Sequence, residues 1–415
     1  MKKMKKNSFL ILAVGIGLSW GHLSAKAQTE PEGSALRVSL LTCGPGDAVY
    51  ELYGHTALRV QDRENGQDWV FNYGVFDFRA PHFEWRFILG QTDFTLGVSP
   101  FWRFAQSYGR QGRWVVEQEL NLLPQERQRL WQALLENSAV DGWTYRYSFL
   151  YDNCSTRALD QIRHCLDGNL VWPETQEKKT YRSLLHEYTA EASPWNAFGQ
   201  DLVLGAEVDR PLQVEEETFL PISAQHWLGR VEVVAADGSK RPLVTSEQLL
   251  VPQGENASQP LPLRPWAAMA LLLAGVCAVS IWDYRRGKLS HWIDNLLMVG
   301  QGMAGLIVAF LFFCSVHPAV GSNWLLLVLH PLPLLYLPVK YRREKQGKTD
   351  YYYRLQLLPL AVYALTAVAG VQAYPAAFHS VVAALALRGI LPFALRHKEQ
   401  RSLGQHDAPV LKSQQ

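Results

Sequence analysis

The feature that most constrains this fold is a series of apolar segments after Pro265. All lack Asp, Glu, Lys and Arg, except for one arginine in the last. They are Trp266–Trp282, Asn295–Val316, Trp324–Val339, Leu355–Tyr374 and Ala376–Leu395, the last with Arg388. Because a helix needs about 20 mostly apolar residues to cross a bilayer, we predict about five transmembrane helices in residues 265–396. Four is the alternative, since prolines interrupt the third segment and the fifth contains Arg388.

Basic residues are confined to alternate connections between these segments. They follow the first, third and fifth segments, and include Arg285, Arg286, Lys288, Lys340, Arg342, Arg343, Lys345, Lys348, Arg396, Lys398 and Arg401. The connections after the second and fourth segments carry no charge. Connections rich in Lys and Arg stay in the cytoplasm. We therefore expect residues before Pro265 to lie outside, and residues 397–415 to form a cytoplasmic tail.

Residues 1–27 have the features of an export signal. Lysines at the start precede an apolar stretch, Phe9–Leu18, and Ala25 and Ala27 supply small residues for cleavage. The alternative is an uncleaved anchor helix. In either case the residues that follow are exported.

The exported region has mixed charges and predicts an α+β fold. We expect a catalytic domain at residues 28–210, a small β-rich extension at 211–252 and a linker at 253–264. The predicted strands are Leu36–Thr42, Thr56–Val60, Trp69–Tyr73, Thr92–Val98 and Val115–Leu122, and helices are predicted from Pro124 and over Tyr181–Tyr188. The net charge is +2 and no basic run contains interleaved aromatics, so no nucleic-acid partner is predicted.

Cys154 lies where a loop is predicted to become a helix. Asp152 and Asn153 are good N-cap residues, and Leu159 and Ile162 follow at near-helical spacing. The first turn of a helix offers unpaired N–H groups and the positive end of the helix dipole. Both favour the thiolate, which is the nucleophilic form. The alternative is a small buried cysteine beside a cap.

His55 is the candidate base, because it follows Gly54 and opens a predicted strand. A Cys at a helix start with a His on a strand is the working pair of papain-like chemistry. Asn72 stands across the hairpin predicted at Asn65-Gly66 and is the candidate third member, with Asp77 and Asp47 as alternatives. The His precedes the Cys, which is the reverse of papain. That order suggests the circularly permuted arrangement of NlpC-superfamily and lecithin:retinol acyltransferase-like (LRAT-like) proteins.

The remaining cysteines and histidines give weaker signals. Cys43 and Cys165 lie in the exported region, where disulfides persist, and either they pair or one of them pairs with Cys154. The histidines lack metal-ligand spacing, so no metal or cofactor is predicted. His317 and Asn323 lie in an outward connection of the membrane region, and suggest either a polar pocket or residues wetted at the interface.

Several motifs together resemble the Lnb family of the Bacteroides-type cell envelope. They are Leu41-Thr-Cys-Gly-Pro-Gly-Asp47, Tyr53-Gly-His-Thr-Ala-Leu-Arg59, Phe71-Asn-Tyr-Gly-Val-Phe-Asp77 and Tyr151-Asp-Asn-Cys-Ser-Thr-Arg157, with Pro194-Trp195, Gly199-Gln-Asp201 and Asp209-Arg210 further along. The resemblance implies an α+β periplasmic domain, similar to a permuted papain-like fold, followed by about five membrane helices. His55 and Cys154 match the family's His and Cys motifs.

The resemblance also implies a function. Members are linked to N-acylation of lipoproteins, with a membrane phospholipid as acyl donor and a diacylglyceryl-lipoprotein as acceptor, at the inner membrane. Cys154 and His55 are then the expected catalytic residues, and Asn72 joins them from its place across the predicted hairpin, not from the resemblance. The expected substrate-binding residues are Tyr53, Asn153, Arg157, His317 and Asn323. Two other functions stay open: a periplasmic cysteine peptidase or amidase acting on peptidoglycan, and a non-catalytic envelope scaffold.

Overall fold

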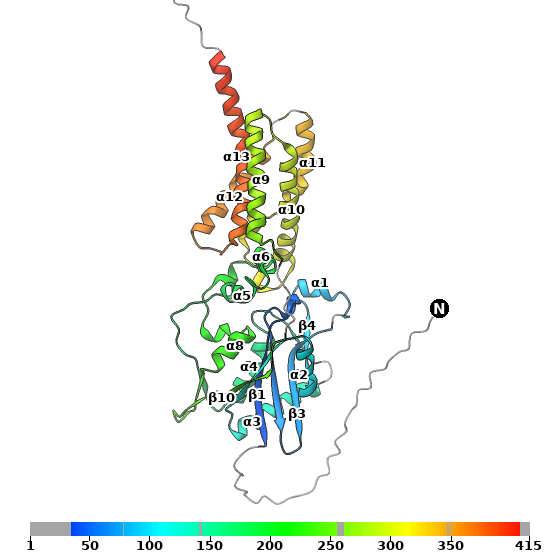
Figure 1. Ribbon diagram of the computed structural model, residues 1–415, viewed down its shortest axis with the longest axis vertical. Helices are drawn as coiled ribbons and strands as arrows, with labels where there is room; N and C mark the ends of the chain where they lie inside the picture. Colours follow the sequence, from blue (N-terminus) through cyan, green and yellow to red (C-terminus); the bar gives the residue numbers. More distant parts are fainter. Residues whose placement is uncertain are drawn as a thin grey trace, which may run out of the picture. The chain divides into compact units, whose positions relative to one another are not determined.

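The structure is a computed structural model, which describes residues 35–77, 79–140, 143–254, 261–346, 348 and 350–406. The predicted signal at 1–27, part of the predicted linker and residues 407–415 of the predicted tail lie outside the described residues. Two regions follow one another along the chain: an α+β region up to residue 254, and a helical region from Pro265 (Figure 1).

A seven-stranded sheet is the centre of the first region, and every neighbouring pair of strands in it is antiparallel. Its order is β10 (Val244–Val251), β5 (Val115–Leu120), β1 (Leu36–Cys43), β2 (His55–Asp62), β3 (Gln67–Val75), β4 (Asp93–Pro100) and β6 (Thr144–Arg146). The five strands predicted from the sequence are confirmed, each to within about two residues at either end.

Eight α-helices accompany this sheet in the described part of the first region. They are α1 (Phe83–Ile88), α2 (Phe101–Arg110), α3 (Pro124–Ala139), α4 (Cys154–Cys165), α5 (Tyr181–Thr189), α6 (Pro194–Val203), α7 (Val214–Glu217) and α8 (Pro221–Leu228). The predicted helix starts at Pro124 and Tyr181 are confirmed. Two short 3₁₀ turns, η1 (Val49–Glu51) and η2 (Ala206–Asp209), complete the inventory.

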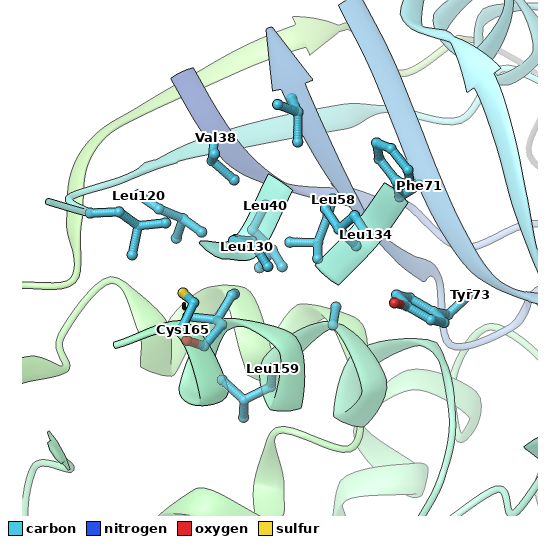
Figure 2. Packing of buried hydrophobic residues seen from close by; sticks show 14 of the residues in the cluster. Val38, Leu40, Leu58, Phe71, Tyr73, Leu120, Leu130, Leu134, Leu159 and Cys165 are labelled. Carbon is cyan, nitrogen blue, oxygen red and sulfur yellow. Dashed lines mark hydrogen bonds between the residues drawn. The ribbon is translucent and has the colours of Figure 1, made fainter. Parts of the chain in front are cut away.

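The hydrophobic core lies between the sheet and helices α3 and α4. Leu40 and Leu58 of the sheet are fully buried, as is Leu130 of α3. Figure 2 shows these side chains converging with Leu159 and Cys165 of α4. Burying such side chains is worth roughly 1.5–3 kcal/mol each, so this packing fixes the position of α4 against the central strands.

The β2–β3 hairpin brings two predicted site residues onto neighbouring strands. Its turn contains Asn65 and Gly66, and Gly66 has φ +63°, a conformation that favours glycine. The paired residues run from Asp62 opposite Gln67 to Leu58 opposite Phe71. His55 is the first residue of β2 and Asn72 lies beyond Phe71 on β3, so both lie at the unpaired end of the hairpin.

Strands from residues 211–252 complete both sheets of this region. β10 pairs with β5 at the edge of the large sheet. A small sheet contains β7 (Asn169–Val171), β8 (Glu232–Val234) and β9 (Lys240–Pro242), in that order. The segment predicted as an extension is therefore continuous with the sheets of the preceding residues.

The second region contains five α-helices in its described residues. They are α9 (Pro265–Arg286), α10 (His291–Cys314), α11 (Leu332–Lys345), α12 (Tyr352–Val368) and α13 (Ala376–His406), with 3₁₀ turns η3 (Pro318–Val320) and η4 (Trp324–Leu327) between α10 and α11. α13 continues to His406, so the first residues of the predicted cytoplasmic tail are helical.

Four segments of the described chain are long and apolar enough to span a membrane, and five were predicted. They are Pro265–Arg286, His291–Cys314, Trp324–Lys345 and Ala376–Arg401. The prediction of five is therefore not confirmed. The fourth predicted segment gives only the 17 residues of α12, because the helix stops just before Gly370, which has φ +66°. The proline-rich segment does qualify, because η4 and α11 together form an apolar run of 22 residues, Trp324–Lys345. Pro331 and Pro333 lie at the start of α11, where proline is tolerated, whereas Pro338 lies inside it.

Arg388, the single charge predicted in the last apolar segment, is buried and paired. Its guanidinium donates to Asp294 of α10 (2.5 Å) and to Asp283 of α9 (2.8 Å). Tyr353 of α12 donates its hydroxyl to Asp294 (2.7 Å). A charge inside a membrane protein is costly unless it is paired, and here the pairing joins four helices.

The uncharged connections of the helical region contact the α+β region. The backbone N–H of Val316, after α10, donates to Leu89 (3.0 Å), and Gly205 donates to Ala319 (2.8 Å). Gln372, after α12, donates to the carbonyl of Leu204 (3.2 Å). These contacts agree with the predicted orientation, in which the connections without basic residues lie on the side of the exported region.

The buried carboxylate of Glu126 provides a test of this fold. It accepts from the backbone of Leu123 and Asp167 (2.7 Å each) and from Arg241 of β9 (2.6 Å). Glu126→Ala leaves these donors unpaired, so we expect the free energy of unfolding to fall by about 3–5 kcal/mol. Glu232→Ala, which breaks the exposed Lys240 pair, should change it by less than about 1 kcal/mol. Urea unfolding of the full-length protein in detergent measures both, and equal losses would contradict this role of Glu126.

Candidate active site

Asn153 fixes the start of helix α4 and so the position of Cys154. Its side-chain oxygen accepts from the backbone N–H groups of Ser155 (2.8 Å) and Thr156 (3.2 Å). Its amide donates to the carbonyls of Phe149 (2.8 Å) and Phe219 (3.0 Å). The predicted cap is confirmed, and Cys154 is the first residue of the helix. Both donors and both lone pairs of the amide are used within the protein, which positions the helix start. The predicted role of Asn153 in substrate binding stays a prediction.

Cys154, His55 and Asn72 form one connected group. The His55 Nε2 atom is hydrogen-bonded to the side-chain oxygen of Asn72, and His55 and Cys154 lie close enough for each side chain to shift the pKa of the other. Because Nε2 is engaged by Asn72, Nδ1 is the ring atom left to face the thiol. The alternatives to Asn72 lie elsewhere: Asp77 is exposed and accepts from the backbone of Arg79 (2.8 Å), and Asp47 is exposed.

The electrostatics of this pair favour a thiolate and an imidazolium. Burial by itself raises the pKa of the Cys154 thiol, but His55, the backbone N–H of Thr56 and the Ser155 hydroxyl stabilise the thiolate, and the net pKa is lowered. Burial likewise opposes the charged form of His55, yet the charge of Cys154 and the bonds to Cys154 and Asn72 raise its pKa. A negative and a positive group thus stabilise each other in a half-buried site.

A second contact holds the helix start against β2. The hydroxyls of Thr56 and Ser155, each adjacent to a member of the pair, are hydrogen-bonded at 2.8 Å and buried. Because His55 is covalently bonded to Thr56 and Cys154 to Ser155, this hydrogen bond also keeps His55 and Cys154 close to each other. The sequence analysis did not identify this contact, since neither residue type is distinctive at its position.

Gly74 keeps the space beside the pair open. It has φ +94°, which favours glycine. A Cβ atom at this position would lie 3.6 Å from Cys154 Cβ, 3.8 Å from the Tyr145 hydroxyl and 4.0 Å from His55 Cε1. These three groups therefore surround one point. Gly74 lies in a motif noted in the sequence, whereas Tyr145 lies in the three-residue strand β6 and carries no sequence signal.

All five cysteines are free thiols, so neither predicted disulfide arrangement forms. Cys43 is buried at the end of β1, with Tyr108 bonded to it, whereas Cys165 is buried at the far end of α4 from Cys154. The two belong to different hydrophobic clusters, which explains why they do not pair. Burial raises the pKa of each to about 12, so Cys154 is the activated thiol of the three.

Tyr53 and Arg157 bind protein groups near the site. The Tyr53 hydroxyl donates to Gln200 (2.6 Å), and its ring packs in a second core with Phe149. The Arg157 guanidinium donates to Asp152 (2.5 Å) and lies 4.5 Å from the centre of the Tyr145 ring. Their roles in substrate binding stay predictions.

His317 and Asn323 lie in the connection between α10 and α11, apart from the Cys–His pair in the chain. His317 donates from Nε2 to the carbonyl of Phe87 (2.8 Å). Asn323 donates to the carbonyl of Leu202 (3.0 Å) and is buried. Both residues join the membrane helices to the α+β region, and their roles in substrate binding also stay predictions.

A nucleophile, a base and an orienting amide are the parts needed for covalent acyl transfer. Within the described ranges, no group of three or more His, Cys, Asp or Glu side chains is arranged to hold a metal ion. A thiol beside an imidazole can support nucleophilic attack with proton transfer.

Two family models match the chain, one in each region. The Lnb N-terminal periplasmic domain matches residues 25–187, which include the whole Cys–His–Asn group. The Lnb transmembrane domain matches residues 255–400, which include helices α9–α12 in full and α13 up to residue 400. No curated protein and no solved structure matches the chain.

The ion pair predicts a pH dependence for the reactivity of Cys154. Iodoacetamide reacts with thiolates, so its rate should rise with a midpoint below the ordinary thiol pKa of about 8.5. His55→Ala removes the cation and leaves the burial, so we expect the midpoint to move upward. Mass-mapped alkylation from pH 5 to 10 measures this, with Cys154→Ala as the control for other thiols. A midpoint that is the same with and without His55 would rule out the pair.

Proposed function

This chain belongs to the Lnb family, and we propose that it is a membrane-bound acyltransferase that moves a fatty acyl chain to the N-terminal amine of lipoproteins. The observation that carries the proposal is the Cys154 thiol next to His55, which is itself hydrogen-bonded to Asn72. That order of nucleophile, base and orienting amide is the papain-like arrangement. We infer a permuted papain-like site, because His55 and Asn72 precede Cys154 in the chain.

The first half-reaction forms a thioester. The Cys154 thiolate attacks the carbonyl carbon of a phospholipid ester, and the carbon–oxygen bond to the glycerol breaks. The His55 imidazolium gives its proton to the departing alkoxide, which leaves as the lysophospholipid alcohol. The N–H groups at the start of α4 supply positive potential next to the developing oxyanion. The products are acyl-Cys154 and neutral His55.

The second half-reaction transfers the chain to nitrogen. The neutral amine of the diacylglyceryl-modified lipoprotein attacks the thioester carbonyl, and the carbon–sulfur bond breaks. His55 accepts the proton that the amine loses, and the Cys154 thiolate is restored. An amide and the original ion pair result, so the cycle needs no cofactor.

The membrane helices favour lipids over peptidoglycan as substrates. Four candidate spans are present in the described chain, and the connections after α10 and α12 bond directly to the α+β region. A soluble muropeptide hydrolase would have little use for such contacts. Both substrates of the proposed reaction are anchored in a bilayer, and the predicted orientation puts the site on the periplasmic side of the inner membrane. The free thiol of Cys154 also disfavours a scaffold in which it forms a structural disulfide.

The proposal predicts which thiol is essential. Purified protein in phospholipid vesicles is given a synthetic diacylglyceryl lipopeptide, and N-acylation is followed by mass spectrometry. Cys154→Ala and Cys154→Ser should each lose at least about 10³-fold in rate, because a serine hydroxyl does not ionise at neutral pH. Cys277→Ala, which changes a thiol in α9, is the matched control and should keep its rate. Normal N-acylation by either Cys154 variant would refute the assignment.

A further inference from the structure

Helix α1 carries three exposed apolar side chains beside the end of a membrane helix. Trp85, Phe87 and Ile88 are 59%, 41% and 38% exposed, whereas Phe83 on the same helix is buried. The Trp85 ring packs edge-on against Phe310 of α10, with centroids 5.9 Å apart. Phe310 lies about one helical turn before the end of α10 at Cys314. The exposed face of α1 therefore lies near the level at which α10 leaves the bilayer.

The C-terminal end of α1 is bonded directly to the residues that follow α10. Helix ends leave carbonyl groups without helical partners. Here the carbonyl of Phe87 accepts from the His317 ring (2.8 Å), that of Ile88 from the Ser315 hydroxyl (2.8 Å), and that of Leu89 from the Val316 N–H (3.0 Å).

Gly90 permits this close approach. It has φ +73°, and a Cβ there would lie 3.0 Å from Val316 Cγ2 and 3.1 Å from His317 N. A side chain at position 90 would therefore be crowded by the residues that follow α10. Figure 1 shows α1 beside the lower end of α10.

A row of aromatic rings connects α1 to the site. The rings are Phe83, Phe76, Phe94 and Tyr147, with successive centroids 5.2, 4.9 and 4.2 Å apart. Burial raises the pKa of the Tyr147 hydroxyl, and the charge of Cys154 raises it further. Tyr147 therefore lies close to Cys154. Stacked rings are well packed and rigid, so the row holds α1 at a fixed position relative to the nucleophile.

We propose that α1 is the element that contacts the outer surface of the phospholipid bilayer and brings the acyl donor to Cys154. Trp and Phe at the headgroup level bury apolar surface and anchor a short helix there. The occupant of the exposed face is therefore the lipid bilayer. The donor role rests on the proposed function, whereas the contact with lipid does not depend on any reaction.

Tryptophan quenching tests the contact. The full-length protein is placed in phosphatidylcholine vesicles with bromine atoms near the headgroup end of one acyl chain. Bromine quenches the fluorescence of nearby tryptophans, so the fluorescence contributed by Trp85 should be weaker in brominated than in ordinary vesicles. The difference between the wild type and Trp85→Phe gives that contribution. Trp102→Phe is the matched control, because Trp102 on α2 is 60% exposed, and it should remove emission that is not quenched. Equal emission from Trp85 in brominated and ordinary vesicles would overturn the proposal.

A rate measurement tests the donor role. Acylation of Cys154 is followed with vesicle phospholipid and with water-soluble 4-nitrophenyl acetate. The Trp85→Ser/Phe87→Ser variant should lose at least about tenfold more rate with phospholipid than with the soluble ester. The Trp102→Ser control should keep its acylation rate with both donors. Equal losses with both donors would overturn the donor role, while a wild-type protein that takes acyl groups from the soluble ester alone would refute the proposed function instead.

A different observation concerns Tyr145, the middle residue of β6. Its side chain is 6% exposed, and its hydroxyl has no hydrogen-bond partner within the described residues. A buried hydroxyl without a partner destabilises a protein by about 1–3 kcal/mol. That hydroxyl lies at the point shared with Cys154 Cβ and His55 Cε1 beside Gly74. Its unused donor is therefore directed into the site.

Two further features keep this hydroxyl in place and protonated. The Arg157 guanidinium lies over the Tyr145 ring and is itself paired with Asp152. Burial, and then the charge of Cys154, raise the pKa of the hydroxyl. At neutral pH it can donate a hydrogen bond and does not compete with His55 as a base.

The geometry points to Tyr145 as a catalytic residue whose hydroxyl donates to the carbonyl oxygen as Cys154 attacks. No proton is transferred; the bond stabilises the oxyanion of the tetrahedral intermediate and then weakens as the carbonyl re-forms. The inference rests on the thioester chemistry proposed above, but it holds for any acyl donor. The same geometry assigns Arg157 as a positioning residue, because its guanidinium holds the Tyr145 ring in place.

Two reactions of the same thiol test this role. Tyr145→Phe should slow acylation by 4-nitrophenyl acetate about 10²–10³-fold. Alkylation by iodoacetamide forms no oxyanion, so it should change by no more than about twofold. Tyr73→Phe is the control, since Tyr73 already accepts from Asn137 (2.9 Å), and acylation should keep its rate. Unchanged acylation in Tyr145→Phe, or a parallel loss of alkylation, would overturn the assignment. A wild-type Cys154 that forms no thioester would refute the proposed function.

Discussion

The capped start of helix α4 is the constraint on which the site depends. A thiol has an ordinary pKa of about 8.5 and is mostly protonated at neutral pH. Asn153 fixes Cys154 in the first helical turn, and the Thr56–Ser155 bond holds that turn against β2. His55 is then close enough to offset the burial that would otherwise keep the thiol neutral. The core packing of α3 and α4 under the sheet is what keeps these short contacts in register.

The membrane region places a second constraint on the same site. The connections after α10 and α12 bond to α1, to residues near α6 and to η2, which ties the α+β region to one side of the bilayer. Arg388 pairs with Asp283 and Asp294, and Tyr353 donates to Asp294, so polar contacts join four helices in addition to apolar packing. A nucleophile held beside a bilayer can meet substrates that do not leave it. This is the physical reason to favour lipids over soluble ligands.

Local signals in the sequence were enough to predict which residues meet at the candidate site. The cap before Cys154, the glycine before His55 and the Asn65-Gly66 hairpin each act within a few residues, and each is present in the structure. Features set by distant residues were not predictable in this way. The proposed disulfides required knowing that Cys43 and Cys165 enter different clusters. The pairing of β10 with β5 and the position of Tyr145 depend on long-range contacts. The count of membrane spans depended on where α12 ends, at Val368.

The central claim is that Cys154 carries the acyl chain between donor and acceptor. Intact-mass spectrometry of the full-length protein, incubated with phospholipid in the absence of any lipoprotein, tests it most directly. The account predicts a mass increase of one fatty acyl chain, mapped to the Cys154 peptide, released by hydroxylamine and absent from Cys154→Ala. An unmodified mass, an adduct on another residue, or an adduct formed from a muropeptide in place of phospholipid would contradict it.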